Sequence, residues 1–178
     1  AVDIKTGSLV WQTPTQSSTI YAEAFKLKIS DIISDSNSIY FSNNMDEFYS
    51  LDLESGLVKW KQNINSTLRP TVVKNLIFTI SSNGLLVIME KKTGNIVRVT
   101  DVFSDLKDKQ RKKIKPIGFI VGKKIIYLTN NNGKLFLIDI ENGKTKKILK
   151  VDNDKISRPL FLKNSLYIAK DNSIIKLN

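Results

Sequence analysis

The chain has 178 residues, enough for a single domain that buries most of its apolar side chains without covalent cross-links. Lys and Arg number 28 against 17 acidic residues, giving a net charge of +11, and Cys and His are both absent. Their absence excludes disulfides, thiolate nucleophiles, Cys/His zinc sites and imidazole bases. No apolar stretch approaches the roughly 18 residues that a membrane-spanning helix needs.

The positive charge has two explanations that the sequence leaves open. Lys, Asn and Ile are all abundant, as the codon usage of an AT-rich genome would produce, whereas an anionic partner would also favour this charge. The lysines are scattered, and few aromatic residues lie among them as a base-stacking platform would require, so we do not expect a nucleic-acid partner. Because the sequence begins at Ala1 with neither Met nor a signal peptide, we interpret it as a fragment or a processed chain.

One motif recurs along the chain: VDIKTGSLVW at residues 2–11 and LDLESGLVKW at residues 51–60. Shorter copies, MEKKTG and IDIENG, follow at a period of roughly 40 residues. An acidic residue stands four positions before each glycine, and the resulting pairs are Asp3 with Gly7, Asp52 with Gly56, Glu90 with Gly94, and Asp139 with Gly143.

Taken in chain order, the sequence predicts short strands and hairpin turns throughout. Segments rich in Ile, Val, Leu, Phe and Tyr alternate with turns containing Gly and Asn, which supply the positive φ of tight hairpins. We expect an outer strand of a blade at 1–13, complete blades at 27–62, 70–102 and 116–151, and three strands of a last blade at 159–178. A polar linker is predicted at 13–19. The fold class is therefore all-β, a β-propeller of about four antiparallel four-stranded blades.

The repeated motif is predicted to hold neighbouring blades together. The carboxylate can accept hydrogen bonds from backbone N–H groups in the turn, and the glycine can adopt a conformation that side chains forbid. Trp11 and Trp60 are large flat residues suited to filling the gap between blades. The corresponding positions in later units are Arg98 and Lys147, whose alkyl stems we expect to cover that gap instead.

No catalytic residue, cofactor site or metal site is predicted. The motif acids occupy a periodic turn position, which favours a structural role over calcium binding. Asp152 and Asp154 alternate like calcium ligands, but no Gly and Glu follow them as in a calcium loop, so we interpret them as part of a solvated loop between blades.

A charged insertion, DVFSDLKDKQRKKIKP, spans residues 101–116. Its acids come early and its bases late, which suits a short helix capped by Ser104. Two interpretations stay open: a solvated connector, or a loop that contacts a partner through Lys107, Arg111, Lys112 and Lys113.

Basic residues also recur immediately before proline, at the start of inner strands: Arg69, Lys115 and Arg158. We expect them to line one mouth of the central channel. They are candidates for partner binding, or else for ion pairs with the turn Asp of a nearby blade. The turns at 43–46, 82–84 and 130–133 are expected on one rim, as a polar docking surface or simply as hairpin turns.

The motif resembles the tryptophan-docking repeat of propellers of the pyrroloquinoline-quinone (PQQ) type. The succession of KISDI, the blade TLRPTVVKNLIFTISSNGLLVIM and the charged insertion resembles the C-terminal half of the BamB family of outer-membrane protein assembly lipoproteins, in its alphaproteobacterial form. The resemblance covers nearly the whole chain. The family's N-terminal half and lipid-anchor cysteine have no counterpart in it.

The resemblance implies half of an eight-bladed ring at the periplasmic face of the outer membrane. It implies a non-catalytic scaffold of the β-barrel assembly (BAM) complex that binds the periplasmic domains of BamA, the central barrel protein, and reaches the membrane only through the missing anchor. The alternative is a quinoprotein-type dehydrogenase or sensory propeller domain. A further hypothesis is that Ala1–Gln12 completes the last blade, within one chain or by exchange between two copies, since open sheet edges associate.

Overall fold

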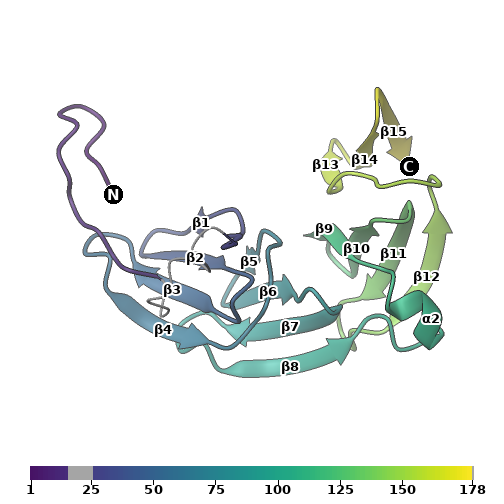
Figure 1. Ribbon diagram of the computed structural model, residues 1–178, viewed down its shortest axis with the longest axis horizontal. Coiled ribbons are helices and arrows are strands. Elements are labelled where there is room, and N and C mark those ends of the chain that lie inside the picture. The colour runs from purple at the N-terminus through teal and green to yellow at the C-terminus, as the bar shows by residue number, and fades with distance from the viewer. Residues whose placement is uncertain (16–25, 178) are drawn as a thin grey trace.

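The computed structural model describes residues 1–15 and 26–177, and its regular secondary structure is almost entirely β-strand (Figure 1). Four antiparallel sheets follow one another along the chain, and we call them blades 1 to 4. Blade 1 contains β1 (Ile33–Ser34), β2 (Ser38–Ser42), β3 (Phe48–Asp52) and β4 (Val58–Gln62). Blade 2 contains β5 (Thr71–Val73), β6 (Leu76–Ile80), β7 (Leu85–Glu90) and β8 (Ile96–Asp101). Blade 3 contains β9 (Pro116–Val121), β10 (Ile125–Asn130), β11 (Lys134–Asp139) and β12 (Thr145–Lys150). Blade 4 contains β13 (Leu160–Leu162), β14 (Ser165–Lys170) and β15 (Ser173–Leu177).

Each blade is a meander in which consecutive strands pair. The middle strands are rich in β-branched and aromatic residues and are buried on both faces, as in β6 (LIFTI) and β10 (IIYLTN). Glycines at positive φ close the hairpins between second and third strands, with Gly84 at +83° and Gly133 at +70°.

The blades stack side by side in an arc (Figure 1). The inner strands β1, β5, β9 and β13 face the hollow of the arc, and the outer strands β4, β8 and β12 form its convex side. The core lies between the blades: Tyr40 and Phe48 of blade 1 pack with Ile77 and Met89 of blade 2. Similar clusters join blade 2 to blade 3 and blade 3 to blade 4. A single blade cannot bury both of its faces, so stacking supplies most of the burial. The prediction of an all-β propeller is confirmed.

The N-terminal residues differ from the predicted outer strand of a blade. Residues 1–13 form no strand of a sheet; a single bridge joins Val2 to Leu9 around the Asp3 turn, and this hairpin projects away from blade 1 (Figure 1). Ile4 at its tip is 98% exposed. An outer strand pairs with the third strand of its own blade, and no such strand lies beside these residues in the described part of the chain. The outer-strand assignment therefore stays a prediction.

The two described ends lie at opposite ends of the arc (Figure 1). Residues 1–12 therefore do not complete the last blade of the same chain in this structure, and exchange between two copies stays a hypothesis. The predicted linker at 13–19 falls outside the described residues from position 16 onward. Among the described helices, none has the length and apolarity needed to cross a membrane.

The charged insertion contains a shorter helix than predicted. Helix α2 spans Asp108–Arg111, with Lys107 at its N-cap and no side-chain cap, so the prediction that the helix starts at Ser104 is wrong. The physical reason is Phe103, which is buried against Phe136 in an edge-on contact with ring centroids 5.3 Å apart. The buried Phe103 side chain holds the residues between it and α2 in turns. Within this segment the Leu106 N–H donates to the Phe103 carbonyl at 3.0 Å. The insertion is therefore attached to the core rather than fully solvated.

Candidate functional site

The recurring acid-to-glycine motif forms the turn between the third and fourth strands of a blade. In blade 1, Oδ1 of Asp52 accepts hydrogen bonds from the N–H groups of Glu54 at 3.1 Å and Ser55 at 2.9 Å, while Gly56 has a φ of +72°. The Ser55 N–H, with Lys59 at 3.0 Å, holds the pKa of Asp52 well below its usual range. Asp3 and Asp139 accept the corresponding backbone bonds. Glu90, one methylene longer, instead accepts from the Thr93 hydroxyl at 2.6 Å.

The two tryptophans lie against the turn of the following blade. Trp60 on β4 donates its indole N–H to the Lys91 carbonyl at 3.1 Å, and its ring stacks on Phe48 with centroids 5.8 Å apart. A Cβ on Gly94 would lie 2.6 Å from the Trp60 ring, so only glycine permits this contact. Trp11 is placed in the same way, with its ring against Gly56 and its indole N–H directed at the Leu53 carbonyl at 3.3 Å.

At the junction of blades 2 and 3, Arg98 on β8 takes the tryptophan position. Its guanidinium donates to the carbonyls of Ile140, at 2.6 Å, and Glu141, within the corresponding turn. Thr100 lies against Gly143, where a Cβ would meet the Thr100 Oγ1 at 2.5 Å. Arg98 thus reproduces the hydrogen bond of the indole rather than covering the gap with its alkyl stem. Lys147 on β12 is exposed, with no following turn beside it in the described residues.

The basic residues before proline lie at the starts of the inner strands, beside the hollow. Arg158 is half-buried and donates from Nε to the Phe119 carbonyl of blade 3 at 3.0 Å. Burial and the nearby charge of Arg69 lower the pKa of Arg158, while Asp31 opposes that change.

Lys115 and Arg69 are both exposed. Lys115 lines a cavity of about 400 Å³ with Lys28 and the turn residues Asn44 and Ser82.

The suggested ion pairs with turn aspartates are wrong, because those carboxylates pair with lysines of the strand that follows each turn: Asp52 with Lys59, and Asp139 with Lys146.

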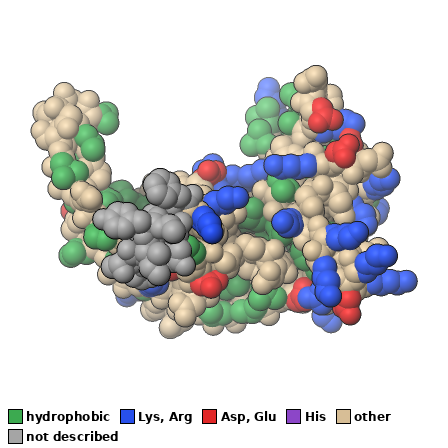
Figure 2. Space-filling view, viewed as in Figure 1, with side chains coloured by type: hydrophobic (Ala, Val, Ile, Leu, Met, Phe, Trp, Pro, Cys, Tyr) green, Lys and Arg blue, Asp and Glu red, His purple; other side chains and the backbone are tan. Residues whose placement is uncertain are grey.

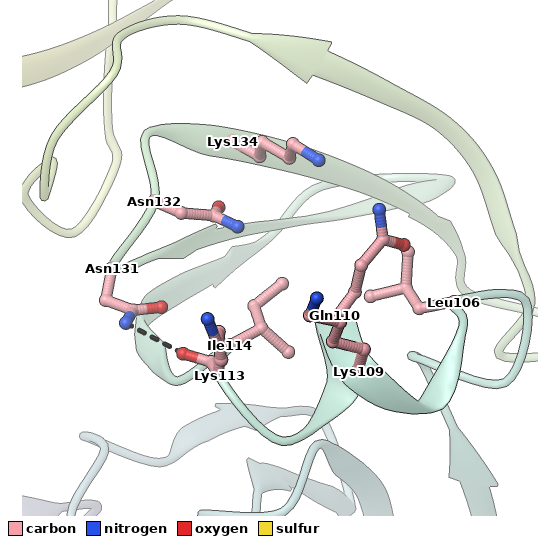
Figure 3. A pocket seen from close by; sticks show the side chains of 8 residues that line it. All are labelled: Leu106, Lys109, Gln110, Lys113, Ile114, Asn131, Asn132 and Lys134. Atoms are coloured by element: carbon pink, nitrogen blue, oxygen red, sulfur yellow. Dashed lines mark hydrogen bonds between the residues drawn. The ribbon is translucent and has the colours of Figure 1, made fainter.

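A second cavity, of about 410 Å³, lies between α2 and the β10–β11 turn (Figure 3). We call it the α2 pocket. Its apolar floor is Leu106 and Ile114, and three ammonium groups surround it, from Lys109, Lys113 and Lys134. Its lining contains no carboxylate. The side-chain amide of Asn131 ties the two elements together, donating to the Lys113 carbonyl at 3.0 Å and accepting from the Lys115 N–H at 2.7 Å.

The structure separates the four basic residues predicted in the insertion. Lys113 lines the α2 pocket, Arg111 forms an ion pair with Asp101, and Lys107 and Lys112 are exposed. The sequence interpretation missed Lys109 within the insertion and Lys134 on β11. Lys109 could have been included from its place in the charged insertion, but Lys134 becomes its neighbour only when blade 3 folds. Lys and Arg side chains are dense on the half of the molecule that holds blade 3 and α2 (Figure 2).

Within residues 1–15 and 26–177, no group of three His, Cys, Asp or Glu side chains is arranged as a metal site. Asp152 forms an ion pair with Lys170 and accepts the backbone N–H groups of Asn153 and Asp154. The Lys170 ammonium and these N–H groups lower the pKa of Asp152 to about 2. The Asp152 carboxylate is thus held by N–H groups of its own loop and by Lys170 of β14.

Four stacked meanders with tryptophans seated on the turn glycines define a β-propeller of the PQQ-like class. The model of the family "Outer membrane protein assembly factor BamB" matches residues 1–100, more than half of the chain. The chain therefore belongs to the BamB family.

Its relatives in two Rickettsia species are uncharacterized proteins. That of Rickettsia prowazekii is 22% identical over 98% of this chain and 45% of the relative, and that of Rickettsia conorii is 23% identical over 80% and 36%. The chain thus spans less than half the length of these relatives.

Several solved structures share the fold. The computationally designed Ika4 protein has a TM-score of 0.64 at 12% identity, over 84% of this chain and 89% of the design. BamB from Moraxella catarrhalis has a TM-score of 0.55 at 14% identity, over 98% and 64% of the two chains. A quinohemoprotein alcohol dehydrogenase from Pseudomonas putida HK5 has a TM-score of 0.54 at 19% identity, over 65% and 19%. At such identities the likeness shows the fold alone.

Proposed function

We propose that this chain is part of a non-catalytic scaffold of the outer-membrane β-barrel assembly machinery, acting at the periplasmic face of the outer membrane. Membership of the BamB family is the observation that carries the proposal. The partner we propose is the set of periplasmic domains of BamA. The motif acids support a non-catalytic role, because they bond to their own turns and to neighbouring lysines.

The α2 pocket is the surface that we propose for this contact. Three ammonium groups without a carboxylate in the lining favour an acidic side chain, and the floor of Leu106 and Ile114 favours an apolar neighbour beside it. Anchoring by Phe103 and Asn131 holds the surface in place before binding, which reduces the entropy lost on association.

Binding of the full chain to the purified periplasmic domains of BamA from the same organism tests the proposal. We expect saturable binding that weakens as salt increases. The double variant Lys113→Glu/Lys134→Glu reverses two charges of the pocket and should weaken binding about tenfold or more. The matched control, Lys155→Glu/Lys176→Glu, reverses two exposed charges outside the pocket and should leave the affinity within about twofold.

If both double variants lost affinity equally, binding would depend on the net charge of the chain alone, and the α2 pocket would be rejected as the binding site. Absence of binding by the wild-type chain would reject BamA as the partner. A rise in the melting temperature on addition of PQQ and Ca²⁺ together would instead support the quinoprotein alternative.

A further inference from the structure

The largest of the cavities described here is a cleft of about 730 Å³ at the junction of blades 2 and 3. It opens between the β5–β6 turn, β8 and the β9–β10 turn. We call it the Arg98 cleft. Its volume falls in the range of small-molecule sites, which is roughly 300–1,000 Å³. Six apolar side chains line it: Val73, Leu76, Phe78, Ile88, Val97 and Ile140.

The corresponding position at the first junction is occupied differently. There Trp60 fills the space over the next turn, stacked on Phe48 and tilted against Tyr40 with centroids 6.1 Å apart. Arg98 bonds to the turn carbonyls, leaving the apolar faces of Phe78 and Ile88 along the cleft. The first junction also holds a cleft, of about 580 Å³, but polar side chains such as Asp35, Ser38 and Lys59 line it, whereas apolar side chains line the Arg98 cleft.

Three cations border this apolar space: Arg98, Lys74 and Lys123. No ion pair involves any of them among the described residues. Both acceptors of the Arg98 guanidinium are neutral carbonyls, and its Nε is buried without a hydrogen-bond partner. A buried donor without a partner is costly, and an anion offers both an acceptor and a compensating charge.

We propose that the Arg98 cleft binds a small amphiphilic carboxylate, with its apolar body against Phe78 and Ile88 and its carboxylate directed to Arg98. The apolar lining selects against strongly hydrophilic anions, and the three cations select against neutral or cationic amphiphiles. This proposal does not depend on the protein partner proposed above, because the α2 pocket and the Arg98 cleft share no lining residue.

Calorimetric titration of the full chain with decanoate tests the proposal. We expect saturable binding of one decanoate, and decyltrimethylammonium, which has the same chain length and the opposite charge, should bind at least tenfold more weakly. Arg98→Gln should weaken decanoate binding about tenfold, since a charged hydrogen bond is lost. Arg98→Trp also removes the guanidinium and should weaken decanoate binding by at least as much.

Lys92→Gln is the matched control, because it removes an exposed cation from the polar cleft of about 580 Å³ at the first junction. Its affinity for decanoate should equal that of the wild-type chain. Equal binding of the anionic and cationic probes, or undiminished binding by Arg98→Trp, would overturn the proposal. Undiminished binding by Arg98→Gln would remove Arg98 as the carboxylate ligand and would also overturn it.

Discussion

At the junction of blades 1 and 2 the docking residue is Trp60, whereas at the junction of blades 2 and 3 it is Arg98. Both donate to the first carbonyl after the turn acid, that of Lys91 in one case and Ile140 in the other. The same backbone carbonyl of the turn thus accepts the hydrogen bond at both junctions, while the donating side chain differs. Trp60 adds aromatic stacking and apolar burial, and Arg98 adds charge beside a cleft with an apolar lining.

The two junctions also differ in their ion pairs. Lys91 of blade 2 reaches back to Asp35 of blade 1 at 2.8 Å. At the second junction, Ile140 takes the place of Lys91, and the cations Lys74 and Lys123 stand at the cleft without a paired carboxylate among the described residues. The first junction is therefore organised for stability, and the second retains a surface able to bind.

The largest expected effect is loss of the indole at the first junction. Trp60→Ala should lower the free energy of unfolding by about 3 kcal/mol, because it removes a stacked aromatic side chain and leaves a cavity between blades. Arg98→Ala, its counterpart at the second junction, should cost about 1 kcal/mol, mainly in hydrogen bonds. Urea unfolding followed by circular dichroism measures both. Equal costs would show that the two junctions do not differ in packing.

An intermediate effect is expected for Gly94→Ala. The alanine Cβ would meet the Trp60 ring, and the φ of +76° adds backbone strain, so we expect a loss of about 2 kcal/mol in the free energy of unfolding. In a Trp60→Ala background only the strain should remain, about 1 kcal/mol. A double-mutant cycle measures this coupling. Gly7→Ala, at a φ of +72° with nothing near its Cβ, is the control for backbone strain alone. Additive effects would refute direct docking of Trp60 on Gly94.

The smallest effect concerns the ion pair at the first junction. Burial raises the pKa of Asp35, but hydrogen bonds from Lys91 and from the N–H groups of Asn37 and Ser38 outweigh it and lower the pKa to about 2. A carboxylate whose folded pKa lies below its ordinary value of 3.8 stabilises the fold above pH 4, and that stability disappears as the pH falls toward 2.

Asp35→Asn should therefore be less stable than the wild-type chain by about 0.5 kcal/mol at pH 7, and equally stable near pH 2. Chemical denaturation across this pH range measures the difference. Lys91→Gln should show the same pattern at this junction. A stability difference that does not change with pH would mean that the carboxylate charge contributes nothing.

Much of the fold could be predicted because the repeat is local. The turn motif, the hairpin glycines and the strand composition each specify a few neighbouring residues, and four copies of the same pattern reinforced the propeller assignment. The positions of Trp60 and Gly94 could be aligned for the same reason. The helix start at Ser104 was predicted wrongly because local capping signals do not register that Phe103 is held in the core.

The candidate sites could be predicted less well, because their residues come from different blades. Lys134 joins Lys109 and Lys113 only through the β10–β11 turn, and the Arg98 cleft takes its lining from two blades. Arg69 and Arg158 were expected at a channel mouth, but nothing in the chain order showed that the turn aspartates would pair with neighbouring lysines instead.

The sequence alone determined the blades, their turns and the residues at each docking position, because backbone hydrogen bonding and glycine conformation act over a few residues. Only the tertiary structure decided that the cleft at the second junction has an apolar lining, whereas the cleft at the first junction is polar and contains the Asp35–Lys91 ion pair. That outcome depends on which side chains of neighbouring blades come together, and these contacts exist only after the sheets have stacked.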